Sequence, residues 1–194
     1  MAIVLSPPHR GAVVTPNATM VGLGEVRAIK AALHSTDMLA TDMLATDMLA
    51  TETLVAYGLG SCVAICLFDA ASKVVGMAHV VLPGTDPAGA PNAKYARSAL
   101  PELMARMQRL GAGDPRRYVA RLAGGAHILS LGGSGSLPRI GLQNAIAVQE
   151  SLKATGIPVR ATDLGGSKGR TVWFNPGEGG QIRVRTIGSA ERRL

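Results

Sequence analysis

One cysteine and one histidine are the residues of this sequence best suited to chemistry. Cys62 ends the glycine-rich run 58–62, and His79 lies on a following apolar segment. A thiolate is a strong nucleophile, and a neighbouring imidazole can remove the thiol proton and stabilise the thiolate. Glycines let the backbone approach a substrate carbonyl and direct N–H groups at its developing charge, a role we assign to Gly60 and Ser61. The pattern predicts a nucleophile, Cys62, and its base, His79, against the more common alternative of a cysteine that only fills the core.

Three apolar segments rich in Val, Ile and Leu surround the pair, at residues 54–57, 63–68 and 74–82. Such segments are typical of strands that are covered on both faces. Cys62 falls where the glycine turn enters the second segment, and Cys66 lies four residues further along it. In an extended chain this spacing spans about 13 Å, which is too far for a disulfide. We therefore expect Cys66 to be a core residue, both thiols to be reduced as in the cytoplasm, and neither a metal nor a cofactor to be needed.

Length and composition set the outer limits of the prediction. The chain has 194 residues, of which 47% are hydrophobic and only 3% aromatic, so one domain with an aliphatic core is expected. No stretch approaches the about 20 unbroken apolar residues of a membrane-spanning helix. The apolar start at residues 1–6 lacks the basic leader of a signal peptide. The sequence therefore predicts a cytoplasmic protein without membrane insertion.

The net charge of +7 comes from basic residues that are not interleaved with aromatic ones. With two Phe, three Tyr and one Trp, the chain offers no stacking platform for single-stranded nucleic acid. An acidic protein surface is the better partner for this charge, with an ordinary solvated basic face as the alternative.

Apolar periodicity and glycines indicate the remaining elements. Amphipathic helices are expected over residues 92–110 and 140–155, the first with Pro101 in its first turn or at a kink. Further strands are expected around Val21 and at residues 118–122, 159–164, 170–174 and 181–186.

A five-residue unit, Thr-Asp-Met-Leu-Ala, occurs three times over residues 36–50. Five residues rotate by about 500° on a helix, so the repeat makes no stable apolar stripe. We interpret it as a low-complexity insertion at about 35–53, with a partner-binding helical arm as the alternative. Residues 1–19 are expected to be a flexible leader, and residues 20–194 a single domain.

Seven short motifs in one order between residues 20 and 170 carry a resemblance to a known family. Written as sequence, they are MVGLGE at 20–25, GLGSC at 58–62, HVVLP at 79–83, AKYA at 93–96, LAGGA at 122–126, IGLQN at 140–144 and DLGGSKGR at 163–170. Together they resemble the chemoreceptor glutamine deamidase family, CheD. The likeness extends from residue 20 to about residue 186, whereas the leader and the repeats have no counterpart in it.

The resemblance implies an α+β fold, a single-domain layered α/β sandwich with mixed sheets like that of bacterial toxin deamidases. It implies hydrolysis of particular glutamine side chains to glutamate in the cytoplasmic domain of methyl-accepting chemotaxis receptors. Cys62 matches the family's nucleophile and His79 its general base. A CheC-like phosphatase is an implied regulatory partner, and a monomer is expected.

One position departs from the family pattern. The family usually has a threonine six residues before the nucleophile as a third catalytic group, and this sequence has Ala56 there. Ser61, Tyr57 or Asn144 are candidates to replace it in space. The alternative function is a binding module of the same fold with weak or lost catalysis; a cysteine protease or transglutaminase-like acyl transferase is more distant.

Two further features have ordinary structural interpretations. The run 165–170 (GGSKGR) resembles a phosphate loop but lacks the Gly-Lys-Ser/Thr end that opens a helix. His127 follows Gly124-Gly125 and is expected to cap or pack beside that turn.

Overall fold

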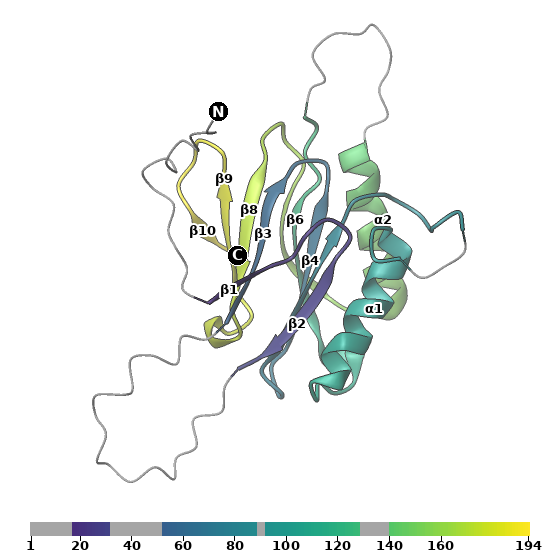
Figure 1. The fold of residues 1–194 in the computed structure, drawn as a ribbon, viewed down its shortest axis with the longest axis vertical. Helices are drawn as coiled ribbons and strands as arrows, with labels where there is room; N and C mark the ends of the chain where they lie inside the picture. Colours follow the sequence, from purple (N-terminus) through teal and green to yellow (C-terminus); the bar gives the residue numbers. More distant parts are fainter. Residues whose placement is uncertain (1–16, 32–51, 89–91, 129–139) are drawn as a thin grey trace, which may run out of the picture.

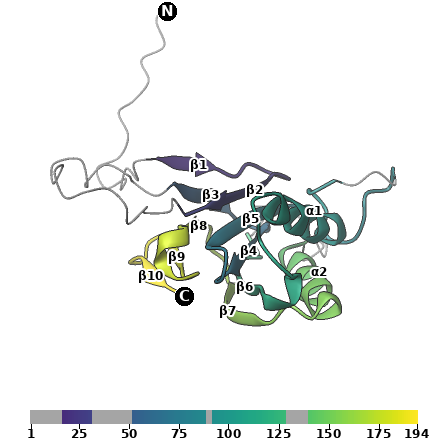
Figure 2. The same cartoon turned by 90° about the horizontal axis from the view of Figure 1, so that it is seen from below.

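Two five-stranded sheets pack face to face, and two helices cover the outer face of one of them (Figures 1 and 2). The computed structural model describes residues 17–31, 52–88, 92–128 and 140–194. The elements in chain order are β1 (Ala18–Met20), β2 (Val26–Lys30), β3 (Thr53–Leu59), β4 (Val63–Asp69), β5 (Val74–Val80), α1 (Ala96–Arg109), β6 (Val119–Gly124), α2 (Ile140–Thr155), β7 (Val159–Leu164), β8 (Arg170–Phe174), β9 (Ile182–Thr186) and β10 (Arg192–Arg193). Short 3-10 turns lie at Pro115–Arg117 and Pro176–Glu178.

Both sheets are mixed. The first has the strand order β1-β3-β8-β9-β10, and the second has the order β2-β5-β4-β6-β7. The pairs β1/β3 and β6/β7 are parallel, and the other neighbouring strands are antiparallel. The α+β layered sandwich with mixed sheets is therefore confirmed.

The second sheet lies between two apolar cores because its central strands are apolar on both faces. On β4, Ile65 and Leu67 pack toward the helices, whereas Ala64 and Cys66 pack into the core between the sheets. All seven residues of β4 and all seven of β5 are buried. The prediction of strands covered on both faces is confirmed for this pair, and Cys66 is a core residue as expected.

Several boundaries differ from the sequence prediction. Instead of one strand around Val21, the chain forms β1 and β2 in different sheets, because it turns at Gly24 with a φ of +69°. Helix α1 begins at Ala96, so Pro101 lies inside it and not in its first turn. The strand expected at 54–57 continues to Leu59, and β5 ends at Val80 before the expected residue 82.

The expected leader and insertion fall mostly outside the described residues. β1 begins at Ala18, so the last two residues of the expected leader belong to the first sheet. The Thr-Asp-Met-Leu-Ala repeats lie outside the described ranges, and the prediction for them stays a prediction. Within the described residues, no helix is long and apolar enough to cross a membrane.

Candidate functional site

Cys62 lies on a short turn between two strands of different sheets. β3 of the first sheet ends at Leu59, and β4 of the second begins at Val63. The thiol is partly buried and packs against the core between the sheets. The turn therefore places the sulfur at the end of that core, at the junction of the two sheets.

His79 lies near the end of β5, on the face of the second sheet that looks toward Cys62. Ala64 pairs with His79 across the β4–β5 ladder, so the two side chains share one face. Cys62 packs against the core between the sheets, which Ala64 also faces, so its side chain lies on the same side of the second sheet as His79. Both residues belong to the described part of the chain, and no hydrogen bond joins their side chains there.

The protonation of the His79 ring is fixed by a backbone carbonyl. Its Nδ1 lies 3.1 Å from the carbonyl oxygen of Val21, and only 2% of the residue is exposed. A carbonyl can only accept, so Nδ1 must carry the proton and Nε2 must be the bare acceptor. Nε2 is buried and has no hydrogen-bond partner in the described part of the chain. The ring is thus held in the tautomer that a general base needs.

The turn between β1 and β2 also forms backbone hydrogen bonds with His79. The His79 amide donates to the carbonyl of Glu25, and the amide of Gly24 donates to the carbonyl of His79, at 3.0 and 2.9 Å. The Glu25 carboxylate accepts from the Gly22 amide at 3.1 Å, and this bond lowers the pKa of Glu25. The motif at 20–25 therefore holds the His79 backbone through Gly24 and Glu25 and its ring through Val21.

Burial favours the neutral form of both Cys62 and His79. Burial lowers the pKa of His79, and the bond to Val21 opposes this only in part. Burial also raises the pKa of Cys62, against a smaller lowering by its own backbone N–H. No charged group among the described residues opposes the desolvation of the Cys62 thiolate, so the resting chain favours the neutral thiol. Burial raises the pKa of the fully buried Cys66 much further.

The backbone of the Cys62 turn is held by the end of β6. The amide of Gly125 donates to the Cys62 carbonyl, and that of Ala126 donates to the Gly60 carbonyl, each at 2.7 Å. A Cβ on Gly124 would lie 2.1 Å from the Cys62 carbonyl oxygen, so only glycine permits this approach. The motif at 122–126 therefore fixes the carbonyls of the turn. The support of an oxyanion by Gly60 and Ser61 stays a prediction.

Of the candidates for a third catalytic group, all of them described residues, none forms a hydrogen bond with the imidazole. Ala56 is fully buried on β3 in the core between the sheets. Tyr57 is 53% exposed, and the Asn144 side chain donates to the carbonyls of Ser61 and Val81. The group that orients the ring is the carbonyl of Val21, which composition could not reveal because any residue type supplies one.

The glycine run after β7 is structural. The Gly165 amide donates to the Gly124 carbonyl, and the His127 amide donates to the Gly166 carbonyl. Arg170 is buried and pairs with Asp163 of β7 at 3.0 Å, which joins the two sheets. The run thus closes the end of the sandwich, and His127 lies beside the glycine turn as expected.

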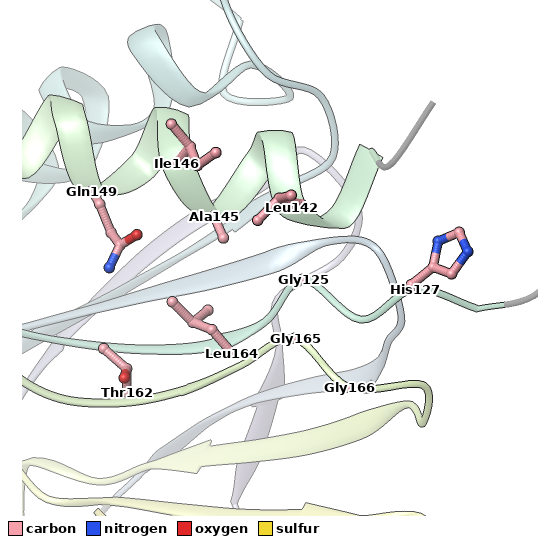
Figure 3. Close-up of a pocket in the computed structure, with 10 residues that line it drawn as sticks. All are labelled: Gly125, His127, Leu142, Ala145, Ile146, Gln149, Thr162, Leu164, Gly165 and Gly166. Atoms are coloured by element: carbon pink, nitrogen blue, oxygen red, sulfur yellow. The ribbon is translucent and has the colours of Figure 1, made fainter. Parts of the chain in front are cut away.

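A cavity of about 570 Å³ opens between α2 and the ends of β6 and β7 (Figure 3). Its lining includes the polar side chains of His127, Gln149 and Thr162 and the large apolar side chains of Leu142, Ile146 and Leu164. Neither Cys62 nor His79 lines it. Among the described residues, no group of three or more His, Cys, Asp and Glu side chains is placed to hold a metal ion.

The fold and these two residues define an α+β sandwich with a candidate cysteine–histidine site where its sheets meet. The profile of the family described as "CheD chemotactic sensory transduction" matches residues 81–186. The chain belongs to the CheD family.

Similar proteins cover most of the chain. A probable chemoreceptor glutamine deamidase CheD of Desulfitobacterium hafniense is 45% identical over 72% of this chain and 86% of its own length. The chemoreceptor glutamine deamidase CheD of Halalkalibacterium halodurans is 40% identical over 73% of this chain and 88% of its own. A solved structure, the hypothetical protein YfiH of Bacillus licheniformis, aligns with a TM-score of 0.35 at 16% identity over 57% of this chain and 46% of that one. That last likeness is too distant to bear on the site.

Proposed function

We propose that this protein hydrolyses the side-chain amide of specific glutamines in chemotaxis receptors, with Cys62 as nucleophile and His79 as general base. The named activity of its relatives supports the reaction class. The observation that supports the residues is the bond from His79 Nδ1 to the Val21 carbonyl, which leaves Nε2 as an unprotonated acceptor on the face shared with Cys62.

The proposed reaction begins from two neutral groups. His79 Nε2 takes the thiol proton as Cys62 Sγ bonds to the glutamine carboxamide carbon, and backbone N–H groups at residues 60–62 stabilise the oxyanion. Collapse of the tetrahedral intermediate breaks the C–N bond, and His79 returns the proton to the departing ammonia. Water then attacks the thioester, gives its proton to His79, and releases glutamate and the thiol. No metal or cofactor enters these steps.

A binding module with weak catalysis is the second candidate. Ala56 offers no hydroxyl, and burial raises the pKa of Cys62, so the resting thiol is not activated. In that function the chain acts through contacts with receptors or with a CheC-like phosphatase. The net charge of +7 suits an acidic partner in either function.

Ammonia release and mass spectrometry of a receptor cytoplasmic fragment test the proposal. Cys62→Ser should abolish conversion of glutamine to glutamate, and His79→Gln should slow it about 10²–10⁴-fold, the usual contribution of a general base. Cys66→Ala is the matched control and should stay active, since Cys66 lies inside the core. Conversion that survives Cys62→Ser refutes the mechanism.

Ala56→Thr separates the two candidates. A threonine hydroxyl at this position would stand in the core between the sheets, which Cys62 also contacts. We expect Ala56→Thr to raise conversion, since one orienting or stabilising group is commonly worth a few kcal/mol in the transition state. Conversion by Ala56→Thr alone, with none by the wild type, would instead identify a binding module that has lost catalysis.

A further inference from the structure

One buried amide group joins the Cys62 turn to the end of the His79 strand. Asn144 of α2 is fully buried, and its Nδ2 donates to the carbonyls of Ser61 and Val81, both at 2.9 Å. Both partners can only accept, so the NH₂ group and not the oxygen must face them. Because one nitrogen binds both oxygens, these lie no more than about 6 Å apart.

These two carbonyls lie where the β4–β5 ladder ends. The last pair of the ladder is Val63 with Val80, and the chains continue past it into the Cys62 turn and into Val81. The amide of Val81 turns away to the carbonyl of Lys94. Past the ladder, the Asn144 side chain bonds to both chains and so ties them together within the described part of the structure.

Asn144 acts from the side of the sheet opposite to the reacting groups. It belongs to the helix layer, where its neighbours Ala145 and Val148 pack into the core between sheet and helices. Cys62 packs instead against the core between the sheets. The Asn144 side chain therefore contacts only the backbone of the turn. It lies on the opposite side of the sheet from a substrate bound at the sulfur.

The rest of the side chain argues against a purely structural role. Asn144 Oδ1 is buried without a hydrogen-bond partner in the described residues. A buried acceptor left unpaired lowers stability, so what the side chain contributes at this position comes from its NH₂ group. The amide contributes what leucine cannot, namely one donor group for two carbonyls on different strands.

We infer that Asn144 is a positioning residue that sets the placement of Cys62 relative to His79. This inference rests on the proposed function, in which proton transfer depends on the distance between the Cys62 and His79 side chains. Without the amide, the turn keeps its bonds to the end of β6 but loses its link to the end of β5, so its distance from the β5 chain is no longer fixed.

A double-mutant cycle on thiol reactivity tests the inference without a receptor. The full-length chain is treated with iodoacetamide across a range of pH, and labelling of Cys62 is followed by mass spectrometry. The variants are His79→Ala, Asn144→Leu, and the two combined. Val148→Ala is the matched control, because it removes buried apolar contacts one turn along the same helix and touches neither carbonyl.

In the wild-type background, His79→Ala should slow labelling near neutral pH at least about 10-fold, and in the Asn144→Leu background less than about twofold. Val148→Ala should keep the full effect of His79, although it also lowers the melting temperature. The pH profile of labelling in Asn144→Leu should match that of His79→Ala. Loss of packing alone would not produce that match.

The outcomes separate the two hypotheses. An undiminished His79 effect in Asn144→Leu overturns the positioning role and leaves the Cys62–His79 mechanism standing. No effect of His79→Ala in the wild type overturns the mechanism, and the inference with it. If Asn144→Leu does not fold, Asn144→Ser replaces it, because one hydroxyl proton can serve only one of the two carbonyls. A full His79 effect in Asn144→Ser then overturns the inference equally.

Discussion

In Gly141→Ala, the higher helix propensity of alanine would raise the free energy of unfolding, whereas steric overlap of the new methyl group would lower it. Gly141 lies in the first turn of α2, and alanine is favoured over glycine in a helix by at most about 1 kcal/mol. A Cβ at this position would lie 2.5 Å from the carbonyl oxygen of Ala126 and 2.6 Å from that of Gly125. Both contacts are with backbone, so relief requires α2 or the turn after β6 to move. Such overpacking costs about 3 kcal/mol.

The net expectation is a loss of about 2 kcal/mol, or a fall in melting temperature of roughly 4–8 °C for a chain of this length. Thermal unfolding measures it. The same movement should disturb Cys62, because Gly125 and Ala126 hold the carbonyls of its turn, so iodoacetamide labelling of Cys62 should change as well.

Gly156→Ala is the control for Gly141→Ala. Gly156 has a φ of +72°, and a Cβ placed there would meet open space, so alanine costs about 1 kcal/mol of backbone strain away from the site. It should lower the melting temperature less and leave Cys62 labelling unchanged. A stabilised Gly141→Ala variant would mean that helix propensity wins and that α2 does not approach the glycine turn closely.

Three further predictions follow from burial and charge. Iodoacetamide should label Cys62 well before Cys66, since Cys66 is 1% exposed and burial raises the pKa of its thiol; equal labelling would show that the second sheet opens. Burial lowers the pKa of His79 below its unfolded value of 6.5, so its contribution to stability is complete above pH 6.5 and is lost as the pH falls below it. The free energy of unfolding, measured with urea, should therefore fall as the pH drops below 6.5, and His79→Gln should reduce this fall. Asp163→Asn should lower the free energy of unfolding by about 3 kcal/mol, because it leaves the buried Arg170 without its charge partner; a change below about 1 kcal/mol in urea unfolding would contradict this.

Much of the fold could be predicted from the sequence because its central strands consist mainly of aliphatic residues. Apart from Asp69 and His79, β4 and β5 are apolar on both faces, and a position between two covering layers accommodates such segments. Cys62 and His79 were predicted from residue type and spacing together with the family resemblance, and their roles stay a prediction. The ends of elements were harder to predict, since tertiary contacts decide them. For example, the chain leaves β5 at Val80 because Val81 and Leu82 donate to the carbonyl of Lys94.

The groups that hold Cys62 and His79 in place could not be predicted, because most of them are backbone atoms. The Val21 carbonyl orients His79, and the amides of Gly125 and Ala126 hold the Cys62 turn. A carbonyl or an amide has no signature in a sequence. Gly124 is a sequence feature that indicates the close approach of two backbone segments, because a Cβ there would overlap the Cys62 carbonyl. It does not indicate which side chains these segments position.

Because burial favours the neutral form of Cys62 and His79, the backbone bonds that hold these residues are central to the proposed chemistry. In a thiolate–imidazolium pair, the attraction of two charges keeps the side chains together. Here burial disfavours the charged form of each group, so no such attraction holds them. The proton must then move as the substrate carbon approaches the sulfur, and transfer of that kind needs the donor and acceptor already aligned. With Ala56 in place of a hydroxyl, alignment depends on the Val21 carbonyl on one side and on the bonds to the Cys62 turn on the other. A change in those bonds should therefore slow the reaction even where every reactive atom is retained.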